Sequence, residues 1–246
     1  MPTHDSRKPD SPALGLHRRV FIVIAAYNEH KKIGDVIEDL HRHGYKNIVV
    51  IDDASKDATT TVARQKGAHV LVHLFNRGQG AALKTGIDYA LRHGAGIIVT
   101  FDADGQHHAS DISSLLEPLR SGTADVALGS RFLLESTQRN IPLIRKAFLK
   151  GGIFFLYLLY GIRVTDSQNG LRAMSRKAAQ QIEIKQDRMP HAGEILDEIH
   201  RRRLKFVEVP VTITYSDYSL GRGENRSSLA ASTKIAFRLI WEKFTH

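Results

Sequence analysis

Residues 96–108 read GIIVTFDADGQHH, and this stretch decides how the chain is organised. An apolar run ends in two carboxylates, Asp102 and Asp104, which are separated by one residue. A short apolar run bounded by turn residues is typical of a buried strand in a parallel sheet. Carboxylates that follow such a strand lie at its carboxyl end, where ligands of α/β proteins collect. The stretch therefore predicts an α/β fold with a ligand site at the end of this strand.

Strands and helices alternate around this stretch. Up to about residue 130, short β-branched runs alternate with amphipathic segments, as expected for βαβ units around a mainly parallel sheet. The helix over 110–122 is predicted to start at a cap formed by Ser110 or Asp111. The predicted strands span 19–27, 47–53, 68–74, 96–104 and 125–132. The other predicted helices span 29–44, 57–67 and 80–94, and a helix at 191–203 and a strand at 205–215 follow in the second half.

The composition suits one α/β domain. The chain has 246 residues, of which 42% are hydrophobic, and this is enough for a sizeable core. Residues 1–17 are polar and contain proline, so we expect a flexible tail before a single domain over 18–246. The tail has no apolar segment of signal-peptide length, which argues against secretion. The absence of cysteine excludes disulfides and a thiolate nucleophile, and it suits a cytoplasmic protein.

The chain is basic, with a formal net charge of +9. This charge favours an anionic partner, which is a nucleic acid, a phosphorylated ligand or an acidic membrane surface. A nucleic acid is disfavoured, because the basic residues are dispersed and the predicted strands lack an aromatic stacking pattern.

Polar side chains follow three of the predicted strands. These residues are Tyr27, Asn28 and Glu29, then Asp52 and Asp53, then Asp102 and Asp104. The carboxyl ends of parallel strands meet at one edge of a sheet, so we expect the three groups to converge on one crevice. Two close carboxylates repel each other unless a cation compensates, and Mg²⁺ or Mn²⁺ prefers such oxygen ligands. A lone Asp-x-Asp is also typical of a turn, and the convergence of three strand ends is what favours the metal site.

Six short motifs resemble one known family in their order along the chain. The motifs are AAYNE (25–29), VVIDDASKDAT (49–59), NRGQGAALKTGI (76–87), FDADGQH (101–107), GSRF (129–132) and DSQNGLRAM (166–174). They resemble family 2 glycosyltransferases, and most closely the branch of dolichyl- or polyprenyl-phosphate sugar synthases. The resemblance covers about residues 19–215. It implies a GT-A fold, which is a single Rossmann-like domain, and transfer of a sugar from a nucleotide donor with a divalent metal.

The resemblance also implies a donor site. The residues expected to bind the nucleotide part of the donor are Ala25, Tyr27, Glu29, Asp52, Asp53, Gly80, Lys84 and Asp102. Asp102 and Asp104 are expected to bind the ribose, the diphosphate and the metal, and Gln106 to join the metal shell. The family usually has proline where this chain has Ala25, a mild departure because a backbone contact does not need the ring. The motif at 76–87 does not fit the spacing of an ATP-binding P-loop, and a plain glycine-bearing helix start explains it equally well.

Two histidines follow the carboxylate pair. His107 and His108 could touch the metal, but a histidine beside a turn is more often solvated, and this is what we expect of both.

The acceptor decides which residues are needed for catalysis. A lipid phosphate is already anionic, so positive groups matter more than a general base. The resemblance implies Arg131, Arg222 and Arg226 as the phosphate contacts. A hydroxyl acceptor would need a base, for which the resemblance implies Asp166 and Glu194 as the candidates. Either of these two could instead pair with a nearby arginine, which is Arg172 or one of Arg201, Arg202 and Arg203. Asp104 and Arg131 are the other residues expected to act in catalysis, and the resemblance implies inversion.

Two segments are candidates for contact with a membrane. Residues 143–162 and 229–246 combine basic and apolar side chains, as interfacial elements do, although a buried core helix explains the apolar residues as well. The most apolar stretch, 152–162, is too short to span a bilayer. We therefore expect a peripheral protein at the inner face of the cytoplasmic membrane, held there directly or through a small membrane protein partner.

Three functions remain as hypotheses. The first is sugar transfer from a UDP- or GDP-sugar to a polyprenyl phosphate, and the second is the same transfer to a hydroxyl of a surface glycan or lipid-linked saccharide. The third is a sugar nucleotidyltransferase, which is disfavoured because such enzymes carry a glycine-rich basic loop after the first strand, where this chain reads AAYNEHKK (25–32).

Overall fold

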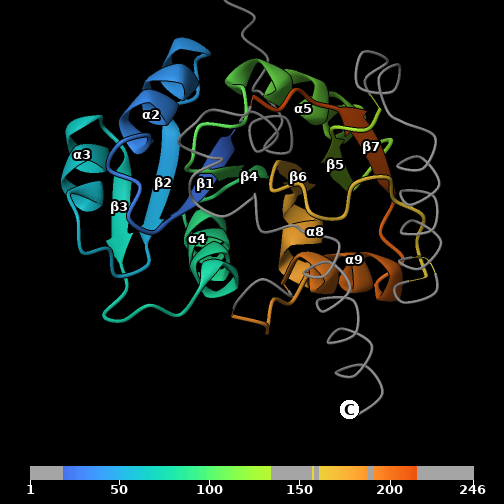
Figure 1. Cartoon of the computed structure of the whole chain (residues 1–246). Coiled ribbons are helices and arrows are strands. Elements are labelled where there is room, and N and C mark those ends of the chain that lie inside the picture. The colour runs from blue at the N-terminus through green and yellow to red at the C-terminus, as the bar shows by residue number, and fades with distance from the viewer. Residues whose placement is uncertain (1–18, 134–156, 158–160, 188–190, 215–246) are drawn as a thin grey trace, which may run out of the picture.

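Seven strands form one sheet in the order β3-β2-β1-β4-β6-β5-β7 (Figure 1). The computed structural model describes residues 19–133, 157, 161–187 and 191–214. The strands are β1 (Val20–Ala26), β2 (Asn47–Asp52), β3 (His69–Val72), β4 (Ile97–Asp102), β5 (Val126–Ser130), β6 (Arg172–Ser175) and β7 (Phe206–Pro210). The helices are α2 (Ile33–Arg42), α3 (Thr59–Gln65), α4 (Gln79–Arg92), α5 (Ile112–Arg120), α8 (Arg176–Gln181) and α9 (His191–Arg201), and a 3₁₀ turn, η1 (Ala109–Asp111), precedes α5.

The sheet is mainly parallel, which confirms the predicted fold class. β1 pairs in parallel with β2 and β4, β2 with β3, and β5 with β7. β6 is antiparallel to both of its neighbours, β4 and β5. The chain leaves β5 and enters β6 at the same edge of the sheet, so β6 has to run in the opposite direction. Arg172, the first residue of β6, consequently lies opposite Thr100, close to the carboxyl end of β4.

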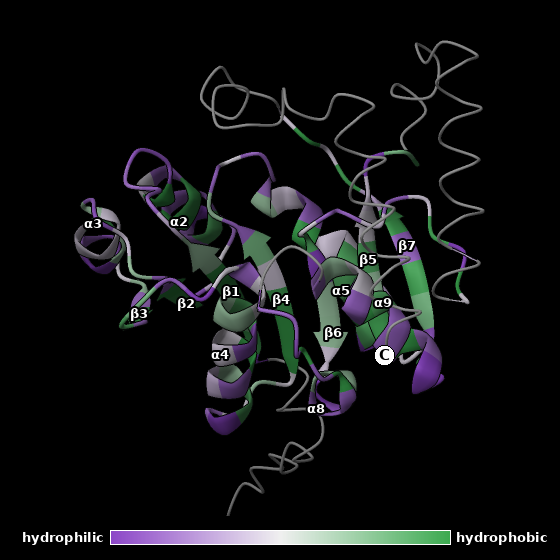
Figure 2. Ribbon diagram, turned by 60° about the horizontal axis from the view of Figure 1, so that its bottom comes forward, coloured by the Kyte–Doolittle hydropathy of each residue, from purple (hydrophilic) through white to green (hydrophobic). Residues whose placement is uncertain are grey.

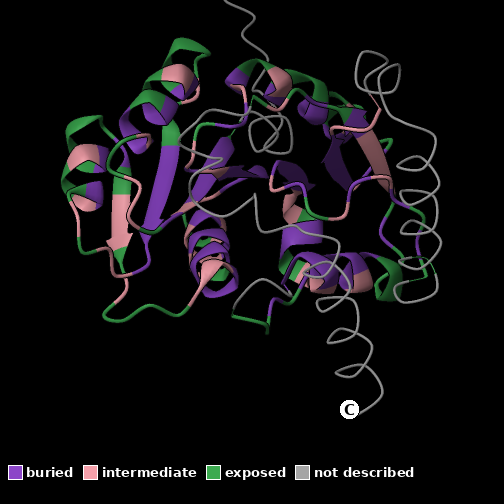
Figure 3. Ribbon diagram, in the orientation of Figure 1, coloured by how far each residue is buried: buried purple, intermediate pink, exposed green. Residues whose placement is uncertain are grey.

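Helices cover both faces of the sheet (Figure 1). Successive side chains of a strand point to opposite faces, and in β1 both sets are apolar and buried. Ile22 and Ile24 pack in one cluster with α2 and α5, whereas Val23 packs in a second cluster with α4 and α9. Figures 2 and 3 show the result, with apolar, buried strands inside and hydrophilic, exposed helix faces outside. This double burial is the reason that the strand sequences read as continuous apolar runs.

The predicted cap of α5 is wrong. Neither Ser110 nor Asp111 caps the helix through its side chain. The carboxylate of Asp111 instead accepts a hydrogen bond from the backbone N–H of Thr212, at 2.8 Å. The acid therefore ties the start of α5 to the segment after β7, and this long-range partner takes the place of the local one.

Candidate donor site

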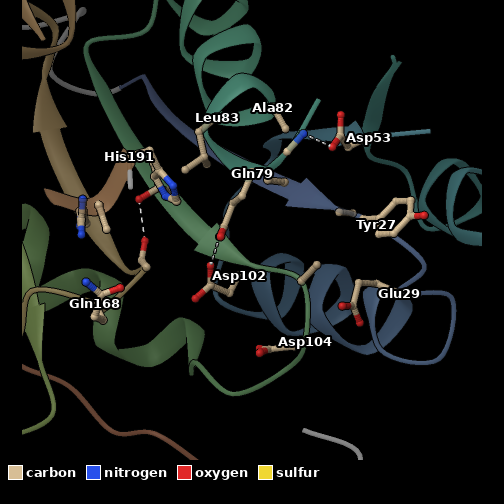
Figure 4. A pocket seen from close by; sticks show the side chains of 18 of the residues that line it. Tyr27, Glu29, Asp53, Gln79, Ala82, Leu83, Asp102, Asp104, Gln168 and His191 are labelled. Carbon is tan, nitrogen blue, oxygen red and sulfur yellow. Dashed lines mark hydrogen bonds between the residues drawn. The ribbon is translucent and has the colours of Figure 1, made fainter. Parts of the chain in front are cut away.

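A cavity of about 460 Å³ opens at the carboxyl ends of β1, β2 and β4 (Figure 4). The start of α4 and the start of α9 form part of its wall, and the segment before β6 forms another part. Its lining includes four acidic residues, two groups that can carry positive charge and four side-chain amides. These are Glu29, Asp53, Asp102 and Asp104, then Arg172 and His191, then Asn76, Gln79, Gln168 and Asn169. The predicted convergence of the three strand ends on one crevice is confirmed.

The end of β4 places Asp102 and Asp104 on the cavity. Gln79 Nε2 donates a hydrogen bond to Asp102 Oδ1 at 3.2 Å, and His107 Nε2 lies 3.0 Å from Asp102 Oδ2. Burial works to raise the pKa of Asp102, but the hydrogen bond from His107 and the nearby charges of His107, Arg172 and His191 outweigh it and lower the pKa. Asp102 is therefore an oriented carboxylate that stays ionised at neutral pH.

Asp104 turns the chain directly after β4. Its Oδ1 accepts a hydrogen bond from the backbone N–H of Gln106 at 3.0 Å, which closes the turn around Gly105. Gly105 has a φ of 77°, a conformation that glycine adopts without strain. The turn leaves Asp104 at the cavity beside Asp102, and Figure 4 shows both carboxylates on the same side of the site.

Arg172 brings a buried positive charge close to this pair. Its Nε and Nη2 donate to the backbone carbonyls of Asn169 and Ser167, each at 3.0 Å. Burial lowers the pKa of Arg172 to about 10, against the opposing influence of Asp102 and Asp166, so the guanidinium remains charged at neutral pH. The sequence indicates Arg172 only as a possible partner for Asp166 or Glu194. Its position in the motif DSQNGLRAM was the available signal for a role at the site.

Gly170 packs directly against the carboxylate of Asp102. A Cβ added at Gly170 would overlap both Oδ1 and Oδ2 of Asp102. The lack of a side chain at this position is thus what allows the segment before β6 to approach the end of β4. Sequence reasoning missed this residue because the contact spans two distant parts of the chain.

Asp53, at the end of β2, lines the cavity and also organises the loop before α4. Its Oδ1 accepts from the backbone N–H of Arg77 at 3.0 Å, and its Oδ2 accepts from that of Gly78 at 2.6 Å. His73 Nδ1 lies 2.7 Å from Asp53 Oδ1. Gly78 has a φ of 104°, which a side chain would make costly. The carboxylate of Asp53 therefore sets the position from which Gln79 reaches Asp102.

Asp52 builds a turn and does not line the cavity. Its Oδ1 accepts from the backbone N–H of Ser55 at 2.8 Å, and its Oδ2 accepts from the hydroxyl of Thr60. Asp52 is buried, with 2% of the residue exposed. The structure accordingly brings Asp53, but not Asp52, to the site.

The end of β1 forms the opposite wall. Ala25, Tyr27 and Glu29 line the cavity, as expected from the sequence, and Figure 4 shows Tyr27 and Glu29 across the site from Gln168 and His191. The loop is held in place by Thr59, whose hydroxyl accepts from the backbone N–H of Glu29 at 2.8 Å. Asn28 has a φ of 56°, which lets the chain turn sharply after the strand.

Gly80 and Lys84 were expected at the donor, and the structure places them elsewhere. Gly80 is buried under the backbone of Gln186 and lies against His191, so that a Cβ would overlap the Gln186 carbonyl. Lys84 points away from the cavity and pairs with Asp88 at 2.8 Å, one helical turn later. The glycine serves close packing between α4 and the segment before α9, and the lysine lies on an outer face of α4.

Asp166 and Glu194, the two candidate bases, are both used within the scaffold. Asp166 is buried, and its Oδ2 accepts from Arg131 Nε at 2.8 Å. Glu194 Oε2 accepts from the backbone N–H groups of Lys185 and Gln186, at 2.9 and 2.8 Å. None of Asp166, Glu194 and Arg131 belongs to the residues that line the cavity.

Gln106 and the two histidines occupy three different environments. Gln106 is buried, does not line the cavity, and accepts the backbone N–H of Thr214 on its carbonyl at 3.0 Å. His108 Nε2 lies 2.7 Å from the hydroxyl of Thr214. His107 is 6% exposed and contacts Asp102, so the expectation that it is solvated is wrong. The strand-like bridge between residues 107 and 213 turns its ring inward, a contact that no local pattern reveals.

Some predicted positions lie outside the described residues. These are the predicted tail over residues 1–17, Arg222, Arg226, residues 229–246, and residues 143–162 apart from 157, 161 and 162. Among the described helices, none has the length and apolar character needed to cross a membrane.

The chain matches known proteins over most of its length. Residues 21–183 match the family described as glycosyl transferase family 2. UDP-N-acetylglucosamine--dolichyl-phosphate N-acetylglucosaminyltransferase of Methanococcus voltae is 34% identical, over 91% of this chain and 96% of the relative. Undecaprenyl-phosphate mannosyltransferase of Micrococcus luteus is 31% identical, over 88% of this chain and 91% of the relative.

The fold also matches a solved structure. Glucosyl-3-phosphoglycerate synthase of Mycobacterium tuberculosis, crystallised in complex with Mg²⁺ and uridine diphosphate, superposes with a TM-score of 0.65 over 95% of this chain and 82% of that chain, at 18% identity. This likeness confirms the predicted GT-A fold. Because the family match covers well over half of the sequence and agrees with the arrangement of the strand ends, the chain belongs to glycosyltransferase family 2 and is a glycosyltransferase.

Proposed function

We propose that this glycosyltransferase moves a sugar from a nucleoside-diphosphate sugar to a polyprenyl phosphate, with inversion at the anomeric carbon. The observation that carries the proposal is the cavity at the carboxyl ends of β1, β2 and β4, which is lined by Asp102 and Asp104. The two named relatives support the acceptor class, because they transfer different sugars but both act on a polyprenyl-type phosphate. The relatives therefore support the class of acceptor more strongly than they support any one transferred sugar.

The nucleoside of the donor is proposed to bind between the end of β1 and the end of β2. Ala25, Tyr27 and Glu29 line one side of this part of the cavity, and Asp53 lines the other. The diphosphate would then extend toward Asp102 and Asp104 at the end of β4. Arg172, which lines the far side together with His191, supplies positive charge beyond the diphosphate.

The residues of the site fit a divalent cation. Carboxylate oxygens are preferred ligands of Mg²⁺ and Mn²⁺, and the lowered pKa of Asp102 keeps its carboxylate ionised. Asp102 and Asp104 would hold the ion, while no group of three or more histidine and acidic side chains with metal-site geometry occurs in the described part of the chain. Two protein ligands leave positions for diphosphate oxygens, as is usual for Mg²⁺. When bound, the ion supplies charge that stabilises the departing nucleoside diphosphate.

Gln106 is not included in this proposed set. Gln106 is buried and does not line the cavity. Its backbone carbonyl accepts a hydrogen bond from Thr214, in the segment after β7.

The transfer needs little acid–base chemistry when the acceptor is a phosphate. An anionic phosphate oxygen attacks the anomeric carbon, and the bond from that carbon to the donor phosphate breaks, with its electron pair leaving on the nucleoside diphosphate. No proton has to be removed from the acceptor. The scaffold bonds of Asp166 and Glu194 agree with this, because the two candidate bases are held away from the cavity. Arg131, Arg222 and Arg226 remain proposed contacts for the acceptor phosphate.

A polyprenyl phosphate is a membrane lipid, so the enzyme would act at a membrane surface. We propose the inner face of the cytoplasmic membrane, where nucleotide sugars are available. Residues 143–162 and 229–246 are the proposed contacts, either with the lipid or with a small membrane protein partner.

Product analysis tests the proposal. The protein is incubated with labelled UDP- and GDP-sugars, Mg²⁺ or Mn²⁺, and liposomes containing polyprenyl phosphate, and the lipid fraction is extracted. We expect a labelled lipid that mild acid releases, as a glycosyl phosphate should. Liposomes containing the dephosphorylated polyprenol are the matched control and should stay unlabelled.

A second arm separates the two acceptor classes. Glu194→Gln should keep transfer to the lipid phosphate within about fivefold of wild type, because the residue binds backbone N–H groups and is not needed as a base. Label that appears only in a hydroxyl-linked glycan, together with a loss of more than about 100-fold in this variant, would instead favour transfer to a hydroxyl.

A further inference from the structure

Protein donors hold both oxygens of the Asp102 carboxylate. Gln79 reaches Oδ1 from the first residue of α4, and His107 reaches Oδ2 from the loop after β4. A carboxylate bonded at both oxygens is oriented before any ligand arrives, while each oxygen keeps a lone pair for the ligand. His107 does not line the cavity, and the proposed transfer gives it no role of its own.

The ring of His107 is itself fixed. The backbone at this position forms an antiparallel bridge with Ile213. The ring meets that of Phe101 in an edge-on arrangement, with centroids 5.6 Å apart and an interplanar angle of 64°. Only 3% of the side chain is exposed. The segment after β7 and the core residue Phe101 thus aim Nε2 at Asp102.

The other ring nitrogen of His107, Nδ1, is buried and makes no hydrogen bond with the described protein groups. A buried polar atom without a partner is unfavourable, and an apolar side chain beside Phe101 would avoid that cost. The contact with Asp102 is the one polar contact of this ring in the described part of the chain, so it is what favours histidine here.

We propose that His107 is a positioning residue of the donor site, which fixes Asp102 in the orientation that receives the diphosphate and its cation. The residue acts through Asp102 and does not touch the donor. Partners that orient a ligating side chain commonly change ligand affinity by one to two orders of magnitude when they are removed. The inference rests on the donor site of the proposed function and is independent of the acceptor.

Three variants isolate the hydrogen bond. His107→Gln keeps an N–H donor at a reach similar to that of Nε2, whereas His107→Leu removes the donor at a similar volume. His108→Gln changes the neighbouring histidine, whose contact is with Thr214 and not with the site. Thermal unfolding of each variant shows whether the fold is retained, and if His107→Leu does not fold, the shorter His107→Asn takes its place.

Calorimetric titration of these proteins with UDP and with GDP, in Mn²⁺ or in EDTA, tests the proposal. With Mn²⁺, we expect His107→Leu to raise the Kd of the nucleotide that wild type binds by about 10- to 100-fold, and His107→Gln by less than about threefold. In EDTA the effect of His107→Leu should be several-fold smaller, because the nucleoside contacts at β1 and β2 are untouched. His108→Gln should bind like wild type.

Three results would overturn the inference. One is a folded His107→Leu protein with the wild-type Kd in Mn²⁺, and another is a His107→Gln protein that binds as weakly as His107→Leu. The third is an equal loss in EDTA and in Mn²⁺, which would indicate a general disturbance of the loop. No lipid is needed for the titration, so a wild-type protein that binds nucleotide but does not label polyprenyl phosphate would refute the proposed acceptor and leave the role of His107 intact.

Discussion

The carboxyl ends of β2 and β4 carry the same kind of residue and use it differently. Asp52 accepts hydrogen bonds from Ser55 and Thr60 within its own loop, and it does not line the cavity. Asp102 and Asp104 line the cavity, where the first is held by Gln79 and His107. Acidic residues at the ends of these two strands, which flank β1, thus divide into a carboxylate that builds a turn and carboxylates that face a ligand. The hydrogen-bond partners, and not the residue types, separate the two roles.

The largest expected effect is on the β4 side. Asp104→Asn should lower sugar transfer by at least about 10³-fold, because it removes a charged oxygen ligand from the proposed cation site. The thermal midpoint should stay close to that of wild type, since Asn can still accept the N–H of Gln106. Transfer is measured with labelled donor in Mg²⁺ and in EDTA. Wild-type rates in this variant, or in EDTA, would remove the cation from the mechanism.

Gly170→Ala should act on the same carboxylate from the other side. Its new Cβ would overlap the carboxylate of Asp102, so we expect the side chain to shift and kcat/KM for the donor to fall by about 10- to 100-fold. Gly34→Ala on α2 is the matched control, because its Cβ would come no closer than 3.2 Å, to the Val62 side chain. Steady-state kinetics with a fixed acceptor give the comparison. Unchanged kinetics in Gly170→Ala would show that Asp102 tolerates displacement.

The matching change on the β2 side should affect stability more than activity. Asp52→Asn weakens two buried hydrogen bonds to a charged oxygen acceptor, and we expect the free energy of unfolding to fall by about 2 kcal/mol. Transfer by the folded fraction should stay within about fivefold of wild type. Urea denaturation and initial rates, measured on the same preparation, separate these effects. A transfer loss as large as that of Asp104→Asn would erase the distinction between the two strand ends.

The smallest effect concerns acid stability at the β2 end. Burial works to raise the pKa of Asp57, but hydrogen bonds from Thr59 and His30 outweigh it and lower the pKa from 3.8 to about 2. A carboxylate whose pKa is lowered by folding stabilises the fold at pH values above its pKa in the unfolded state. This stability is lost as the pH falls from about 4 through 2. Urea denaturation at several pH values should therefore show a steeper acid loss in wild type than in Asp57→Asn. Parallel pH dependences would contradict the assigned pKa.

Much of the fold, and the cavity residues at the ends of β1 and β4, were predictable because their signals are local in sequence. The alternation of apolar strands and amphipathic helices predicts a parallel sheet, in which Asp102 ends a buried strand and Asp104 follows it closely. Tyr27 and Glu29 stand at the end of β1 for the same reason. A residue up to three positions beyond a strand must lie near the edge of the sheet, so its place follows from the strand itself.

The remaining assignments depended on contacts between distant segments, and only the tertiary structure decided them. Gly170 and Arg172 reach Asp102 because β6 is antiparallel and starts beside the end of β4, a direction that its four residues do not encode. Glu194 is a candidate base from the sequence, but its carboxylate accepts hydrogen bonds from the backbone of residues 185 and 186. His107 looked solvated because its contacts with Phe101 and Ile213 depend on how the segment after β7 folds back. Sequence by itself determined which residues stand at the strand ends, and packing determined which of them face the ligand, since a side chain's role follows from the partners that reach it.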